Sequence, residues 1–182
     1  MTAPRVDRVV VLCEDELHKR FLMRWLAHRN IQLVDAEVAP SAKGSGSAYV
    51  KNRFQLFVKK AKQKANQTGL GFIVMLDGDA HGAIAQKVAL EKLIAGDETL
   101  KLIFENSVVA LIPTWSIDTW IQAICGMEVM ESMKTSVPTK RNIDDEMIRR
   151  ATENFDIFRR ALPAHLPAMI DAQSELKKLD LA

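Results

Sequence analysis

The sequence contains little of what marks secreted, disulfide-bonded or membrane proteins. Among its 182 residues there are only two cysteines, Cys13 and Cys125, which lie in separate apolar runs without a C-x-x-C spacing. That usage argues against a disulfide framework or a structural zinc site and is typical of reduced core cysteines. No apolar run reaches the roughly 20 residues of a membrane span, and the N-terminal stretch lacks the apolar region of a secretory signal. We therefore expect a cytoplasmic protein without a membrane partner.

A strong net charge is also missing. The chain has 25 Lys and Arg against 23 Asp and Glu, which leaves +2 at pH 7. This balance neither demands nor excludes a nucleic-acid partner. Evidence for such a partner has to come from local clusters of basic residues. The length suits one domain with a small helical addition.

What the sequence does contain is an alternation of short apolar runs and amphipathic segments. The apolar runs, expected as strands, are 8–14, 31–39, 71–79 and 107–113. The segments expected as helices are 15–30, 49–67, 82–95, 116–125, 142–162 and 167–179. Such alternation predicts right-handed crossovers and a Rossmann-like α/β fold, with a mostly parallel sheet of four strands between helices. We expect this α/β domain over residues 1–126 and a helical extension over 127–182 packed on the same domain.

Four acids follow three of the expected strands. Glu14 ends the first strand, Asp77 and Asp79 end the third in the stretch FIVMLDGDAHG, and Asp118 comes just after the fourth. Sites in parallel sheets form at the carboxyl ends of the strands, so we expect these acids on one rim. Clustered carboxylates raise each other's pKa unless a cation neutralises them. Hard oxygen ligands favour Mg²⁺ or Mn²⁺, and the predicted metal ligands are all four acids.

An ordinary turn is the alternative interpretation of this stretch. Asp79 could cap the helix that begins near His81, and Asp15 and Glu16 could stabilise a helix N-terminus through the macrodipole. In this interpretation His81 belongs to a first helical turn. We expect His18 on the surface of its helix.

Basic residues gather around the Gly/Ser loop PSAKGSGSA and the helix that follows it. The helix N-terminus could hold a phosphate, and basic side chains could contact a nucleic-acid backbone without sequence preference. A mobile loop followed by a solvated basic face is the alternative. The predicted phosphate or nucleic-acid ligands are Lys43, Lys51, Arg53, Lys59 and Lys60.

The order of these motifs resembles the Toprim domain of topoisomerases, primases and nucleases of the overcoming-lysogenization-defect type. The resemblance rests on VVVLCED…HKRFL, on IVMLDGD, and on LIPTWSIDTW, which is similar to the P-x-x-x-I-E-x-W segment of small stand-alone Toprim-like proteins of bacterial defence. Together the blocks span residues 8 to 120. Where family members commonly have Gly after the glutamate this chain has Asp15, and His18 stands where some carry a further acid.

The resemblance implies a Mg²⁺- or Mn²⁺-dependent nuclease in which Glu14, Asp77 and Asp79 are catalytic. It also implies nucleic acid, DNA or RNA, as substrate, a phage-defence role with an ATPase partner protein, and leaves room for a homodimer. The only tyrosine, Tyr49, lies beside the loop, so hydrolysis fits better than covalent strand passage. Two other readings stay open: a non-catalytic module that binds nucleic acid or protein, and a small phosphatase or nucleotide-processing enzyme.

Overall fold

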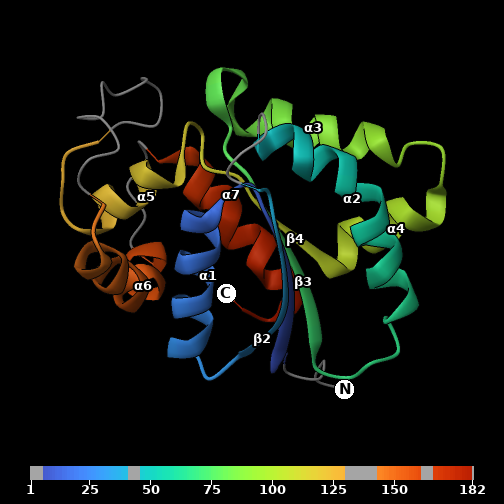
Figure 1. The fold of residues 1–182 in the computed structure, drawn as a ribbon, viewed down its shortest axis with the longest axis horizontal. Coiled ribbons are helices and arrows are strands. Elements are labelled where there is room, and N and C mark those ends of the chain that lie inside the picture. Colours follow the sequence, from blue (N-terminus) through green and yellow to red (C-terminus); the bar gives the residue numbers. More distant parts are fainter. Residues whose placement is uncertain (1–5, 41–45, 130–142, 161–165, 182) are drawn as a thin grey trace.

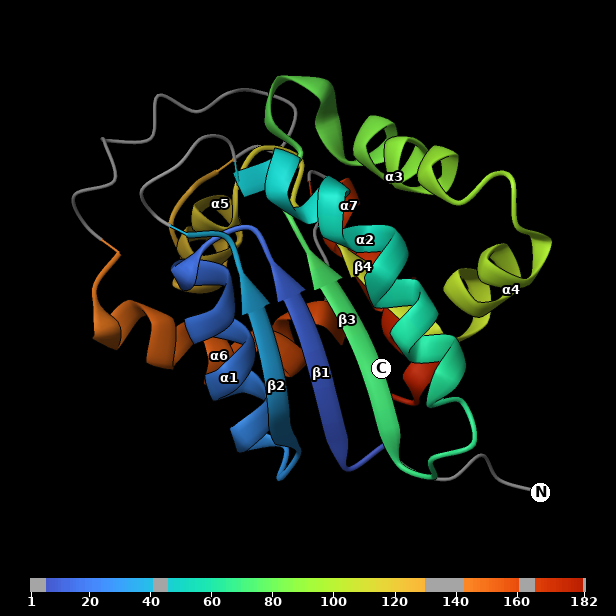
Figure 2. The same cartoon turned by 45° about the vertical axis from the view of Figure 1, so that its right-hand side comes forward.

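Four parallel strands form the centre of the molecule, in the order β2-β1-β3-β4. The computed structural model describes residues 6–40, 46–129, 143–160 and 166–181. The strands are β1 (Arg8–Cys13), β2 (Gln32–Val38), β3 (Leu70–Met75) and β4 (Val108–Leu111). The arrows of β1, β2 and β3 point the same way in Figure 2, and β4 pairs with β3 in parallel. The predicted α/β class with a parallel four-stranded sheet is therefore confirmed.

Helices cover both faces of this sheet (Figure 1). One face carries α1 (Glu16–His28), α5 (Ile117–Ile124), α6 (Asp145–Arg160) and α7 (Pro167–Leu176). The other carries α2 (Gly46–Gln63), α3 (Gly82–Leu93) and α4 (Glu98–Ser107). Two short 3₁₀ helices, η1 (Asp79–His81) and η2 (Lys177–Leu179), follow β3 and α7. None of the helices in the described ranges is long and apolar enough to cross a membrane.

The sheet divides the apolar interior into two clusters. Successive strand residues point to opposite faces: Val9, Val11 and Cys13 of β1 pack with α1, α5, α6 and α7, whereas Val10 and Leu12 pack with α2, α3 and α4. This two-sided burial explains why the strands appear in the sequence as continuous apolar runs and not as alternating ones. Cys13 is a buried free thiol whose pKa is raised by burial.

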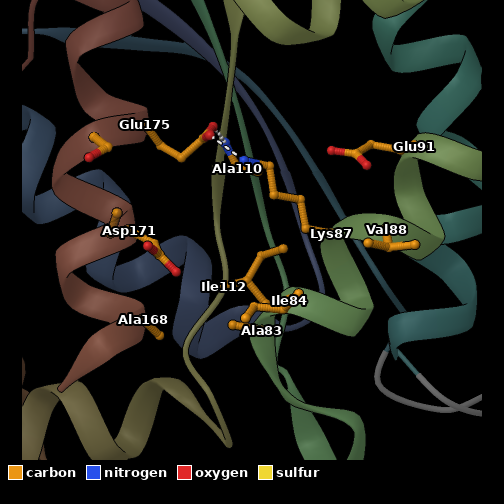
Figure 3. A pocket seen from close by; sticks show the side chains of 12 residues that line it. Ala83, Ile84, Lys87, Val88, Glu91, Ala110, Ile112, Ala168, Asp171 and Glu175 are labelled. Atoms are coloured by element: carbon orange, nitrogen blue, oxygen red, sulfur yellow. Dashed lines mark hydrogen bonds and ion pairs between the residues drawn. The ribbon is translucent and has the colours of Figure 1, made fainter. Parts of the chain in front are cut away.

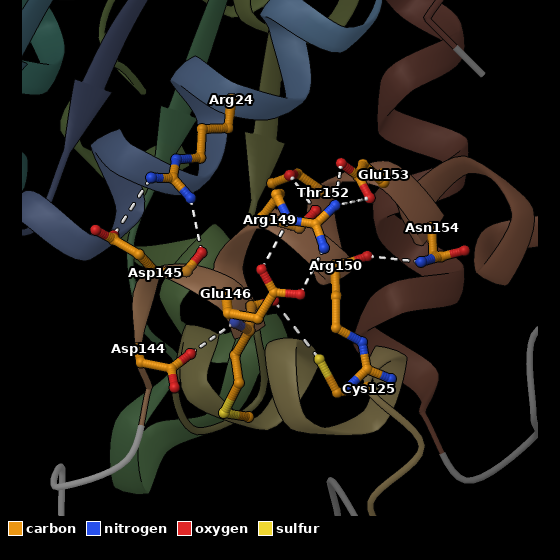
Figure 4. A network of polar contacts seen from close by, with 11 residues as sticks. Arg24, Cys125, Asp144, Asp145, Glu146, Arg149, Arg150, Thr152, Glu153 and Asn154 are labelled. Atoms are coloured by element: carbon orange, nitrogen blue, oxygen red, sulfur yellow. Dashed lines mark hydrogen bonds and ion pairs between the residues drawn. The ribbon is translucent and has the colours of Figure 1, made fainter.

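The C-terminal helices belong to the first of these clusters. Phe155 of α6 packs edge-on against Phe21 and Trp25 of α1, with ring centroids 5.3 and 5.4 Å apart, and stacks on Trp120 of α5. A polar network surrounds the start of α6, where Arg24 donates to the backbone carbonyl of Asp145 at 2.7 Å (Figure 4). Helix α6 thus packs on the same side of the sheet as α1 and α5.

Helix α7 lies along the open edge of β4. Glu175 accepts the backbone N–H of Ala110 at 2.9 Å, and Lys178 donates to the carbonyl of Val108 at 3.3 Å. Lys87 of α3 pairs with the same glutamate at 2.8 Å. These side chains form hydrogen bonds with backbone groups on the open edge of β4. Without them, those backbone groups could pair with another strand. Beside them, α3, β4 and α7 line a cavity of about 430 Å³ (Figure 3), whose lining includes none of the four predicted acids.

Two of the differences from the sequence-based expectation concern β3 and α4. Strand β3 ends at Met75, four residues before the predicted end, because the chain then turns into η1. Helix α4 was not predicted at all. Its buried side chains Leu100 and Phe104 lie one turn apart, and Asp97 caps its N-terminus by accepting the N–H of Leu100.

Candidate acidic site at the carboxyl ends of β1 and β3

The candidate site lies where the chain reverses its direction across the sheet. From β1 the chain passes to β2 on one side, then returns to β3 on the other side of β1. The carboxyl ends of β1 and β3 therefore flank the topological switch point, where ligands bind in open parallel sheets. At this end of the sheet lie the first turns of α2 and the segment between β3 and α3 (Figure 2).

Glu14 and Asp77 meet at this switch point. The backbone N–H of Asp77 donates to Oε2 of Glu14 at 2.8 Å, and the N–H of Glu14 extends the β1–β3 ladder to the carbonyl of Met75. Burial raises the pKa of Glu14, and the carboxylates of Asp77 and Asp79 raise it further, against the N–H of Asp77 and the charge of His18. The sequence-based expectation that strand ends bring these acids together agrees with this geometry.

The first residue of α2 packs directly on Glu14. A Cβ at Gly46 would lie 2.4 Å from both Cγ and the backbone oxygen of Glu14. No side chain fits in that space, so this position requires glycine. Next to it, Oγ of Ser47 is buried and has no hydrogen-bond partner among the described residues.

Asp77 joins three elements through one carboxylate oxygen. Its Oδ1 accepts the backbone N–H of Ile117, the first residue of α5, at 2.9 Å and faces Nε2 of His18 at 3.0 Å. Ser116 is the N-cap residue of α5, but its side chain makes no capping hydrogen bond. Asp77 therefore caps α5 from a different part of the chain.

His18 is not on the surface of its helix, as the sequence predicted, but fully buried. Its Nδ1 lies 2.8 Å from Oδ1 of Asp15, which is the N-cap of α1 and also accepts the backbone N–H of His18. Burial alone would lower the pKa of His18, but the hydrogen bonds and charges of Asp15 and Asp77 raise it to about 10. The prediction was wrong because these partners come from a cap and from a distant strand end.

The histidine has the reciprocal effect on Asp15. Burial raises the pKa of this carboxyl, but hydrogen bonding to the His18 ring and its charge outweigh burial and lower the pKa to about 2. The interpretation of Asp15 as a helix-terminus residue is confirmed by its capping bond. Its second role, as a partner of a buried imidazole, has only a weak sequence signal: a histidine three residues after an N-cap aspartate.

The two aspartates of the D-G-D turn, Asp77 and Asp79, lie in different environments on either side of Gly78. Gly78 is buried against the segment after β4, where a Cβ would lie 2.2 Å from the carbonyl oxygen of Thr114. Asp79 is exposed and has a left-handed backbone with φ of +50°. His81 is exposed at the N-cap position of α3 without a capping hydrogen bond. Asp118 is half-buried in the first turn of α5.

The donor set limits how a metal ion could be held. No group of three His, Cys, Asp or Glu side chains within the described ranges is arranged to hold one. Glu14 and Asp77 each keep one carboxylate oxygen, Oε1 and Oδ2, without a hydrogen bond in the same ranges. Mg²⁺ is often bound by one or two carboxylates, with water and substrate phosphate as its other ligands. The residues present fit that arrangement and do not form an all-protein cage.

The predicted basic ligands divide into three groups. Arg53 pairs with Glu37 at 3.0 Å, and Lys60 pairs with Asp35, so acids of β2 neutralise these two cations. Lys51 is half-buried and Lys59 exposed. Lys43 lies outside the described residues. Pairing between α2 and β2 could not be read from the helix sequence, because the acids belong to an earlier strand.

Comparison of the chain with family models, with curated proteins and with solved structures gives no match. Any functional conclusion therefore rests on the geometry of the acids and on the sequence motifs.

Proposed function

We propose that the protein is a Mg²⁺- or Mn²⁺-dependent phosphodiesterase of Toprim type that cleaves nucleic acid. The observation that carries the proposal is the meeting of Glu14 and Asp77 at the switch point, where the backbone N–H of Asp77 donates to Oε2 of Glu14 at 2.8 Å. A structural turn alone does not require a second, half-buried carboxylate at that position. Burial raises the pKa of Glu14 most, and the charges of Asp77 and Asp79 raise it further. A divalent cation would relieve this repulsion among the three acids.

The chain's own residues would divide the chemistry as follows. A bound divalent ion supplies charge stabilisation for the phosphodiester oxygens. Glu14, whose raised pKa brings it closer to neutrality, is suited to accept a proton from the attacking water. Asp77 is held by Ile117 and His18 through Oδ1, and its Oδ2 makes no hydrogen bond within the described ranges. Exposed Asp79 and half-buried Asp118 are the further acids of this rim.

A non-catalytic binding module is the second candidate. This candidate is favoured because Asp77 already has a structural role, capping α5 and hydrogen-bonding His18. It is also favoured because no group of three His, Cys, Asp or Glu side chains in the described ranges is arranged to hold a metal ion. In either case we propose nucleic acid as the partner, a cytoplasmic location, and a phage-defence role with an ATPase partner. Lys51 and Lys59 are the better candidates for backbone contacts, since Arg53 and Lys60 are already paired.

The test is cleavage of plasmid DNA, single-stranded DNA and RNA with Mg²⁺, Mn²⁺ or EDTA. We expect Glu14→Gln to lower turnover by a factor on the order of 10² or more, as for other acid–base groups. Glu16→Gln is the matched control, because Glu16 is an exposed first-turn acid two residues away. Binding of nucleic acid should persist in Glu14→Gln and weaken with salt. Binding without cleavage by the wild type would favour the module, and neither binding nor cleavage would exclude both.

A further inference from the structure

The cavity between α3, β4 and α7 is lined by none of the acids of the proposed site (Figure 3). Its volume of about 430 Å³ falls within the range of roughly 300–1,000 Å³ that is typical of sites for small organic molecules. Apolar side chains form most of its lining, among them Ala83, Ile84, Val88, Ile112 and Ala172. Ile84 and Val88 lie one turn apart on α3 and are exposed, so a ligand that covered them would gain from the burial of apolar surface.

One wall of the cavity carries an ion pair that is complete. Glu175 of α7 is buried, and its Oε1 accepts from Nζ of Lys87 at 2.8 Å. Its Oε2 accepts from the backbone N–H of Ala110 at 2.9 Å and from Nζ of Lys178 at 2.7 Å. Burial would raise the pKa of Glu175, but the bonds from Lys178, Lys87 and Ala110 lower it, so the carboxylate stays charged. Lys87 is the one basic residue among the described residues that line the cavity, and an anionic ligand would have to compete with Glu175 for it.

Two carboxylates on opposite walls of the cavity have no such partner. Asp171 of α7 and Glu91 of α3 are exposed, and neither carboxylate takes part in a hydrogen bond or an ion pair with another described residue. Figure 3 shows both side chains directed into the space between the two helices. Burial lowers the pKa of Lys87, but the hydrogen bond and charge of Glu175, and then the charges of Glu91 and Asp171, raise it. With Lys87 offset by Glu175, the lining keeps an excess of negative charge.

We propose that this cavity binds a small organic cation, an amine with an apolar body. The body packs on Ile84, Val88 and Ile112, and Asp171 and Glu91 attract the ammonium group. The charge of the lining decides the class of ligand, because a neutral molecule makes no use of the two acids and an anion is repelled by them. The site is independent of the proposed nuclease activity, since it uses no residue of the acidic rim.

The test is a titration of the isotope-labelled protein with tryptamine, followed by the NMR signals of its backbone amides. Tryptophol, which is neutral, and indoleacetate, which is an anion, are the matched ligands. We expect tryptamine to shift the amides of the lining residues of α3 and α7 and to bind more tightly than tryptophol by a factor of about three to ten, the scale of one or two exposed ion pairs. Indoleacetate should shift none of them, and added salt should weaken the binding of tryptamine more than that of tryptophol. Equal affinity for the three ligands, or shifts confined to other parts of the chain, would overturn the proposal.

Two variants test the origin of the affinity. Glu91→Gln combined with Asp171→Asn removes both carboxylates and should reduce the affinity for tryptamine to that for tryptophol. The matched control is Glu146→Gln combined with Glu153→Gln, which removes two exposed acids of α6 and should leave the affinity unchanged. Val88→Trp fills the cavity from a position that is 41% exposed, so the fold should tolerate it, and tryptamine binding should be lost. Undiminished binding of tryptamine by the first variant or by folded Val88→Trp would contradict the proposal.

Discussion

A buried charged side chain such as that of His18 is seldom the most stable solution for a protein interior. Removing ions from water costs several kcal/mol per ion, which mutual attraction repays only with good geometry. His18 meets that condition, since each ring nitrogen has a carboxylate oxygen within 3.0 Å. Packing alone would favour an apolar residue on the inner face of α1, where Phe21 and Leu22 are buried. A polar residue there points to a role at the rim and not to stability.

The charge of His18 predicts how stability depends on pH. Its folded pKa of about 10 exceeds the ordinary value of 6.5, so the folded state binds the extra proton between these values. Its stabilising contribution is complete below pH 6.5 and is lost as pH rises through about 10, at up to about 1.4 kcal/mol per pH unit. Denaturant unfolding of wild type and His18→Gln from pH 6 to 10 measures this loss.

The His18→Gln variant should be less stable than wild type near pH 6 and should approach it near pH 10. Parallel stability curves for the two proteins would show that folding does not change the pKa of His18. Asp15 contributes in the opposite range: its pKa is lowered to about 2, so its stabilisation is present above about pH 4 and disappears as pH falls through 2.

At the scale of elements, the close packing of α2 on the end of β1 fixes the position of Glu14. Alanine normally favours a helix over glycine by about 1 kcal/mol. At Gly46 this preference is outweighed, because the new Cβ would lie 2.4 Å from Glu14. The helix start and the glutamate can therefore not move independently.

Gly46→Ala should lower the free energy of unfolding by about 1–3 kcal/mol, as overpacking does, and weaken Mn²⁺ binding by displacing Glu14. Gly96→Ala is the matched control, since a Cβ there meets nothing within 4 Å. Chemical denaturation and Mn²⁺ titration of both variants measure the two effects. Equal behaviour of the two variants would show that α2 does not position Glu14.

The strands and most of the helices, though not α4, could be predicted from the sequence because each depends on a local pattern. Apolar runs such as RVVVLC predict buried strands, and the strand-end rule then brings Glu14 and Asp77 together. The burial of His18 and the pairing of Arg53 with Glu37 could not be predicted in this way. Both depend on contacts between distant segments, and neither leaves a period or a spacing in the sequence.

At the scale of the whole molecule, the C-terminal helices complete the core and do not form an appendage. Phe155 contacts two rings of α1 and one of α5. Arg24 and Arg29 of the α1 region also reach α6, at Asp145 and Asp156. If residues 127–182 were removed, the face of α1 that packs against α6 would be exposed.

Phe155→Ala should lower the free energy of unfolding by about 3–5 kcal/mol, as large-to-small changes at buried aromatic sites do. Ile84→Ala is the comparison, because Ile84 is 76% exposed and its truncation should change stability by no more than about 0.5 kcal/mol. Urea denaturation measures both. A small effect at Phe155 would mean that α6 contributes little to the fold.

The division of the interior by the sheet has a consequence for how the sequence can change. Phe155 and Phe54 belong to different clusters, on opposite faces, so their substitutions should be additive within about 0.3–0.5 kcal/mol. Phe54 and Phe104 share a cluster, with ring centroids 5.2 Å apart, and should show a coupling of about 0.5–1.5 kcal/mol. Each face can therefore drift in sequence on its own, with compensating changes confined to one side of the sheet.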